Sequence, residues 1–146
     1  MRITILGSGT SHGIPVIGCS CQVCTSKNPK NNRTRSSVWV QEDGTSVLID
    51  IGPEFRIQAL RSGVNRVDAL FLTHAHADHT HGLDDLRTLS REKIIPVYGN
   101  SQTLEEIRRR FAYIFEESHQ GGGKPRISLE ENATFPVRVG SLEIQA

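Results

Sequence analysis

The sequence lacks a long hydrophobic run, and neither sign of charge is in clear excess. No apolar stretch approaches the roughly 18 residues of a membrane-spanning helix, so a membrane protein is not expected. The 17 basic and 16 acidic side chains leave a net charge of +1. That balance gives no overall attraction to nucleic acid or anionic lipid. The apolar run at the N-terminus is also too short for a signal peptide. A cytoplasmic location is therefore expected.

Cysteine is scarce and confined to one place, at Cys19, Cys21 and Cys24. An odd, crowded set does not fit a disulfide framework, and a bond between Cys19 and Cys21 would be strained. Three neighbouring thiols are instead typical of metal binding, although a closed structural zinc site needs four ligands and the chain has no fourth cysteine. The cluster is interpreted as a structural zinc site, with redox chemistry or no function as alternatives.

Hydrophobic periodicity predicts an α/β fold, and 146 residues are enough for one domain with a real core. The Asp43-Gly44 pair predicts a hairpin between two strands, which excludes a purely parallel Rossmann sheet. Thr103-Leu-Glu-Glu106 matches a capping box and predicts a helix that runs on to Phe115. Strands are predicted at residues 2–6, 37–41, 46–50, 67–72, 94–98, 135–139 and 142–145, and further helices at 53–62 and 83–89.

The segment from Thr73 to Gly82 holds four histidines and one aspartate directly after a predicted buried strand. Two histidines at alternate positions of an extended chain point the same way, so His74 and His76 can share one metal ion. If the chain turns after Ala77, Asp78 and His79 can present ligands to a second ion. Imidazole and carboxylate together suit zinc, iron or manganese, and two such ions can bridge a hydroxide. The alternative is a solvated polar loop.

This pattern, Thr-His-x-His-x-Asp-His followed by glycine, resembles the signature of the metallo-β-lactamase superfamily. The resemblance implies an αβ/βα four-layer sandwich with a mixed sheet. It places His74 and His76 at the first metal and Asp78 and His79 at the second. Asp78 would also lie close to the nucleophile or leaving group, which makes it the candidate catalytic residue. Asp50 would support the histidine loop by accepting a hydrogen bond from a ligand imidazole, the alternative being a plain strand-end residue.

The stretch Gly7-x-Gly-Thr-Ser-x-Gly-x-Pro15, continued through the cysteines, resembles the branch that contains the phosphoribosyl cyclic phosphodiesterase of bacterial phosphonate breakdown. In that branch the three cysteines bind a structural zinc together with a histidine from near the C-terminus. His12 lies in this stretch and is a candidate for substrate contact, against a purely structural role in the loop. His119 is predicted to lie in a loop, with a lid or substrate contact as one interpretation. Arg108 to Arg110 are interpreted as a solvated helix face, with contact to phosphate or nucleic acid as the alternative.

The superfamily pattern also requires ligands that the chain does not contain: a third histidine for the first metal, a bridging aspartate and a last histidine. We therefore expect residues 1–146 to be the N-terminal part, about half, of a single domain. Half of a two-sheet sandwich leaves an apolar sheet face uncovered. The chain is expected to be stable only with a complementing C-terminal segment or another copy of itself, and to be inactive alone.

The function predicted from the sequence is that of a metal-dependent hydrolase. It would be a phosphodiesterase acting on a small cyclic or ribosyl phosphate through a metal-activated water, with two divalent ions (zinc, manganese or iron) besides the structural zinc. A small phosphorylated substrate is expected, and nucleic acid is not. The alternatives are an RNase-like nuclease, a thioester or lactone hydrolase of the same superfamily, and a truncated, non-catalytic metal-binding module.

Overall fold

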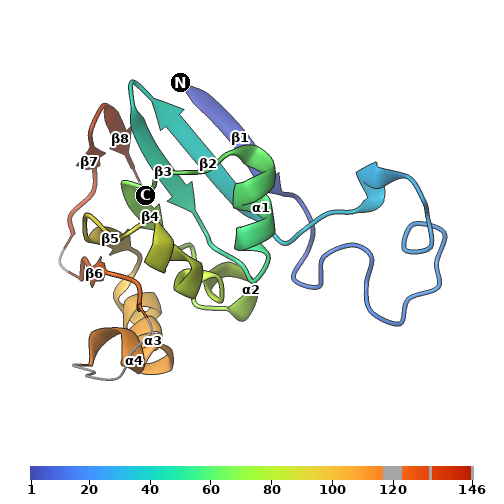
Figure 1. Ribbon diagram of the computed structural model, residues 1–146. Helices are drawn as coiled ribbons and strands as arrows, with labels where there is room; N and C mark the ends of the chain where they lie inside the picture. Colours follow the sequence, from blue (N-terminus) through green and yellow to red (C-terminus); the bar gives the residue numbers. More distant parts are fainter. Residues whose placement is uncertain (117–122, 132, 146) are drawn as a thin grey trace.

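A computed structural model describes residues 1–116, 123–131 and 133–145, in which six strands form one mixed sheet (Figure 1). The first three strands are antiparallel and the last three add on in parallel, in the order of the chain. The predicted hairpin is confirmed, since Asp43 and Gly44 have φ of 45° and 78°, as its tight turn requires. The strands are β1 (Arg2–Gly7), β2 (Ser37–Glu42), β3 (Thr45–Ile49), β4 (Ala69–Phe71), β5 (Ile95–Tyr98) and β6 (Ile127–Leu129).

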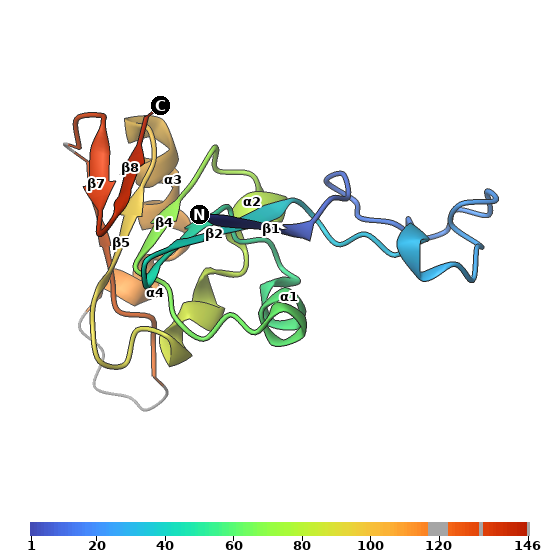
Figure 2. The same cartoon turned by 90° about the horizontal axis from the view of Figure 1, so that it is seen from above.

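Helices pack on one face of the sheet, and a small hairpin lies on the other face (Figures 1 and 2). The hairpin consists of β7 (Val137–Val139) and β8 (Leu142–Ile144). None of the described helices has the length and hydropathy needed to cross a bilayer. The helical segments are η1 (Pro29–Asn31), α1 (Phe55–Ser62), α2 (Ala77–Thr80), η2 (Leu83–Thr88), α3 (Ser101–Arg110) and α4 (Ala112–Phe115).

The sheet separates two hydrophobic cores because successive side chains of a strand point to opposite faces. In β3, Leu48 enters the core on the helix side, whereas Val47 enters the core beneath the hairpin. The helix-side core is the larger and takes fully buried side chains from α1, η2 and α3. The hairpin covers only part of its face, since Ile3 and Ile5 of β1 are both 58% exposed. The predicted α/β architecture is confirmed, with one face of the sheet more completely covered than the other.

Three details differ from the sequence prediction. The capping box at Thr103 is wrong: the cap of α3 is Asn100, whose side chain accepts a hydrogen bond from the Thr103 amide at 2.8 Å. Asparagine is the stronger N-cap, and it moves the helix start to Ser101. The helix also breaks at Phe111 (φ −113°, ψ 37°) instead of running on. The short strand β6 was not predicted, and His119 lies outside the described residues.

A half-buried carboxylate, that of Asp68, links β3 to the segments before β4 and β5. Asp68, with a side chain 12% exposed, accepts hydrogen bonds from the amide of Ser46 at 2.8 Å, from Arg66 and from Lys93. Burial alone raises the pKa of Asp68, but the bonds from Lys93, Arg66 and Ser46 outweigh it and hold the pKa below its ordinary value of 3.8. Asp68 therefore stabilises the native state while it is ionised.

We expect Asp68→Asn to lower the free energy of unfolding by about 1–2 kcal/mol at neutral pH. Because the folded pKa is depressed, this stabilisation is present above the unfolded pKa and is lost as the pH falls through the folded pKa. The difference between variant and wild type should therefore shrink in acid, as measured by urea unfolding. Glu143→Gln, which removes an exposed ion pair with Arg138, serves as the control and should change stability little.

The connection between β1 and β2 extends away from the body as an arm of residues 8–36 (Figures 1 and 2). It is long but ordered by backbone pairing at its base, where Gly9 bridges Arg35 and Ile14 bridges Arg33. Farther out it carries the three cysteines and Ile17, which is 99% exposed. The arm is therefore fixed at its root, and its side chains contribute little to the hydrophobic cores.

Candidate metal centre

The histidine segment begins where β4 ends, as the sequence predicted. β4 is buried, and the chain leaves its carboxyl end through Thr73 before turning into α2. The ring centroid of His74 lies 4.7 Å from that of His76 and 4.0 Å from that of His79. The fold thus gathers the three imidazoles at one end of the sheet, although they come from both sides of a turn.

A single buried carboxylate organises this segment. Asp50, 5% exposed, follows β3 in the left-handed region, with φ of 59°. Its two oxygens accept hydrogen bonds from the amide and hydroxyl of Thr73, both at 2.8 Å, and from Nδ1 of His79 at 2.7 Å. The contact predicted for Asp50 is therefore made to His79. Since Nδ1 of His79 is occupied, its Nε2 is the nitrogen left to face outward.

The outward atoms of Asp78 and His79 lie side by side. Oδ2 of Asp78 is 3.1 Å from Nε2 of His79, and both side chains are about one-sixth exposed, at 16% and 17%. A carboxylate oxygen beside an imidazole nitrogen is a ligand pair that suits zinc, manganese or iron. His74 has its Nδ1 beside the Thr73 hydroxyl at 3.0 Å, which leaves its Nε2 available too. These imidazole and carboxylate groups therefore suit a divalent metal ion, and the structure brings them together as pairs of ligands.

Two glycines let the histidine segment lie against the end of β3. A Cβ on Gly52 would meet the carbonyl oxygen of Asp78 at 2.4 Å, and one on Gly82 would meet the carbonyl oxygen of Gly52 at 2.3 Å. Backbone hydrogen bonds join the same segments, from Ile51 to His79 at 2.8 Å and from Gly82 to Ile51 at 2.9 Å. The backbone on either side of α2 is therefore fixed by contacts that admit no side chain.

The cysteines converge in the arm. Among the residues that the structure describes, only one group of three or more metal-ligating side chains (His, Cys, Asp or Glu) has all of its ligand atoms within 4.8 Å of one another. That group is Cys19, Cys21 and Cys24. A backbone hydrogen bond from Cys24, followed by the thiols of Cys19 and Cys24, lowers the pKa of Cys21 to about 7. The Val16 amide donates to the sulfur of Cys24 and opposes the effect of burial and neighbouring thiols, which together raise the pKa of Cys24. Three clustered sulfurs fit a zinc ion.

His12 lies at the root of the arm, exposed, with Nδ1 3.4 Å from the Ser11 hydroxyl. The carbonyl of Ser11 accepts a hydrogen bond from Arg35 at 2.7 Å. The Cβ of Arg35 in turn lies 3.6 Å from where a Cβ on Gly52 would stand. His12 thus belongs to a loop tied to the same side of the molecule as the metal centre, and its contact with substrate stays a prediction.

A sequence profile described as the β-lactamase superfamily domain matches residues 45–146, which include the whole histidine segment. The chain belongs to the metallo-β-lactamase superfamily. The match extends from β3 to beyond the β7–β8 hairpin, so it takes in the strand that precedes Asp50, the turn at α2 and most of the helix-side core. The fold class predicted from the histidine signature is confirmed.

Relatives of this superfamily member carry several names. A protein named octanoyltransferase from Porphyromonas gingivalis is 42% identical over 147 residues, covering 99% of this chain but 30% of that protein. A ribonuclease Z from Bradyrhizobium is 31% identical over 117 residues, covering 76% of this chain and 37% of that enzyme. The chain thus spans about a third of the length of these curated relatives.

A solved structure described as a new diphosphatase from the PhnP family is similar over nearly the whole chain. It superposes with a TM-score of 0.86 at 41% identity, covering 98% of this chain and 54% of the diphosphatase. The superposition includes the arm that carries the cysteines, because so little of the chain is left out. This resemblance agrees with the branch indicated by the glycine and cysteine spacing.

Two contributors to the site were not predicted from the sequence. Thr73 holds Asp50 through both its amide and its hydroxyl, and its place directly before His74 was the only available signal. Arg110 of α3 donates a hydrogen bond to the carbonyl oxygen of Ala75, between two of the histidines. Arg110 is 35 residues away in sequence, and periodicity alone assigned it to a solvated face.

Proposed function

We propose that this superfamily member is a metal-dependent hydrolase that holds two divalent ions, zinc, manganese or iron, at the histidine segment. His74 and His76 would bind the first ion, and Asp78 and His79 the second. The observation that carries the proposal is the side-by-side placement of Asp78 Oδ2 and His79 Nε2 at 3.1 Å, with Asp50 holding the other nitrogen of His79. In a merely solvated loop, no buried carboxylate would be required to orient a histidine.

Each side chain would have a distinct task in the reaction. When bound, the metals supply a hydroxide at neutral pH and neutralise charge on the substrate. Asp50 holds Nδ1 of His79 and so would direct Nε2 toward the metal. Asp78 is the proposed catalytic residue: its carboxylate would orient the attacking water and carry a proton toward the leaving group. His12 is proposed to contact the substrate from the root of the arm.

The proposed substrate is a small phosphate ester, cyclic or ribosyl, cleaved as a phosphodiester. Support comes from the similarity to the PhnP-family diphosphatase, which covers the arm as well as the histidine segment. The near-neutral charge of the chain gives no general attraction to RNA. A nuclease is the second candidate, because ribonuclease Z from Bradyrhizobium is 31% identical over 76% of the chain. A cytoplasmic location is proposed because the three cysteines form no disulfide.

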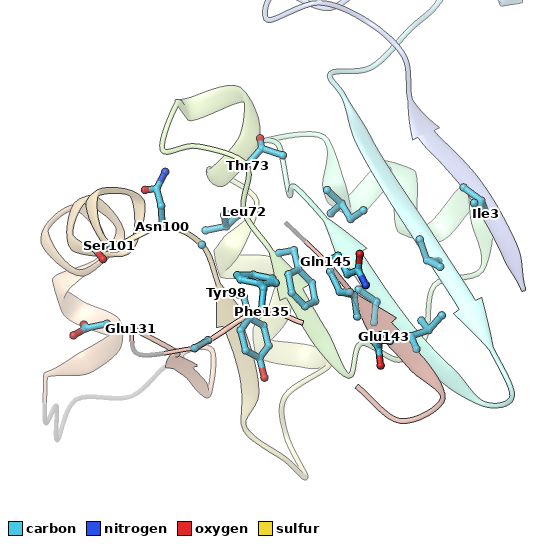
Figure 3. Close-up of a pocket in the computed structure, with 18 of the residues that line it drawn as sticks. Ile3, Leu72, Thr73, Tyr98, Asn100, Ser101, Glu131, Phe135, Glu143 and Gln145 are labelled. Carbon is cyan, nitrogen blue, oxygen red and sulfur yellow. The ribbon is translucent and has the colours of Figure 1, made fainter. Parts of the chain in front are cut away.

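We propose further that residues 1–146 form the N-terminal part of a single domain and act with a complementing segment or a second copy. A cavity of about 860 Å³ lies on the hairpin side of the sheet, lined mainly by apolar side chains (Figure 3). Thr73 lies at the upper rim of this cavity, between Ile3 on one side and Ser101 on the other. An apolar hollow that reaches the histidine segment suits an additional layer of structure bringing further metal ligands.

The function is tested by hydrolysis assays with manganese on a cyclic ribose phosphate and on a tRNA precursor. We expect the isolated chain to bind metal and cleave neither. A complementing C-terminal segment should restore cleavage of the cyclic phosphate, and Asp78→Asn should abolish it. Cleavage of the tRNA precursor in preference would favour the nuclease. Hydrolysis by the isolated chain, sedimenting as a monomer, would contradict the need for a partner.

A further inference from the structure

Three consecutive arginines at the end of α3 make three different sets of contacts. Arg108 pairs with Glu131 at 2.6 Å and lies over the Phe115 ring, 5.3 Å from its centroid. Arg109 pairs with Glu106 at 2.8 Å and is 71% exposed. Arg110 pairs with the same Glu106 oxygen at 2.9 Å, but it also reaches the carbonyl oxygen of Ala75. Only Arg110 of the three connects α3 with the histidine segment.

The residue after Arg110 makes a second contact with that segment. The ring of Phe111 lies edge-on to the ring of His81, with centroids 5.8 Å apart. Ala75 precedes α2, and His81 is its C-cap. The contacts of Arg110 and Phe111 therefore fall at opposite ends of this short helix. α2 has only four residues, and two of them are Asp78 and His79. A helix of this length is not stable by itself and depends on tertiary contacts.

We propose that Arg110 is a positioning residue for the metal centre. It fixes the backbone between His74 and His76, while Phe111 holds the far end of α2. Glu106 keeps the guanidinium of Arg110 directed toward Ala75, since it bonds Nε and leaves Nη1 for the carbonyl. The break between α3 and α4 falls at Phe111, the residue whose ring contacts His81. The inference rests on the proposed metal site.

Cobalt binding to the 146-residue chain tests the proposal, with the visible bands of cobalt followed at the histidines. The thiolate charge-transfer band reports separately on the cysteines. We expect Arg110→Ala to weaken cobalt binding at the histidines about tenfold, the lower end of what outer-shell changes cost. Arg109→Ala, which removes the neighbouring arginine and a bond to the same Glu106, should leave binding unchanged. Arg110→Lys can still donate one hydrogen bond and should recover part of the loss.

Amide hydrogen exchange provides a readout that needs no metal. The amides of His79 and His81 donate to the carbonyls of His76 and Ala77, and their exchange should be faster in Arg110→Ala than in Arg109→Ala. Equal cobalt affinity and equal exchange in these two variants would overturn the proposal. If the wild type takes no cobalt at the histidines, the proposed function fails, whereas the exchange comparison still decides the role of Arg110. If Arg110→Ala does not fold, Arg110→Lys against Arg109→Lys carries the same comparison.

Discussion

An Asp50→Ala variant is expected to lose about 3 kcal/mol of unfolding free energy, because three part-buried hydrogen bonds, two from Thr73 and one from His79, lose their buried acceptor together. The positive φ of this position is also less favourable for alanine than for aspartate. With His79 no longer oriented, metal binding at the histidine segment should fall by ten- to a hundredfold. Urea unfolding and metal titration on the same samples measure the two effects.

Asp50→Asn separates the contribution of charge from that of shape. It keeps the backbone preference and one acceptor oxygen, so we expect a loss of about 1 kcal/mol. It should still weaken metal binding clearly, because its single acceptor oxygen cannot serve both the Thr73 amide, which bonds Oδ1, and His79, which bonds Oδ2. If both variants retained wild-type stability and metal affinity, Asp50 would be only a strand-end residue, the alternative that the sequence allowed.

Replacing Cys19 and Cys21 together with serine is expected to remove about one zinc ion per chain, as measured by mass spectrometry on protein purified without added metal. The three sulfurs of the arm converge, and loss of two of them leaves one ligand where a structural site needs four. Metal that survives in the variant belongs to the histidine segment. The measurement therefore counts the two populations separately.

Ser20→Ala is the matched control, since it changes an exposed residue between the two cysteines and removes no metal ligand. It should keep the full zinc content. Zinc retained in the double serine variant at the wild-type level would contradict the cysteine site. An absence of metal from all three proteins would contradict both sites in this chain.

The sequence was most informative where chemistry is local. The turn at Asp43-Gly44 follows from the conformations that these two residues favour, and the structure has it. The histidine segment was recognisable because its spacing and the buried strand before it lie in one stretch. The superfamily pattern predicted a contact from Asp50 to a histidine of this segment, and the structure has it at His79. The metal-binding roles of the histidines and of Asp78 stay predictions.

What escaped prediction depends on pairs of residues that are distant in sequence. Arg110 and Ala75 meet only because α3 packs beside the histidine segment, and nothing in the run of three arginines distinguishes the last. The close approach of Gly52 to Asp78 is likewise a property of the packed backbone. The misplaced cap of α3 has a different cause: two capping signals, at Asn100 and Thr103, stood three residues apart, and the stronger side chain prevailed.

The position of the arm in the fold determines how freely its length and sequence can vary. Its two ends join β1 and β2, which are antiparallel neighbours, so in topological terms it is an enlarged hairpin loop. Gly9 and Ile14 pair with Arg35 and Arg33 at its root, and the register of the sheet is set below that point. Doubling the length of such a loop costs only about 0.6 kcal/mol of closure entropy. The arm can therefore grow, shrink or change its ligand while the strands that deliver Asp50 stay where they are.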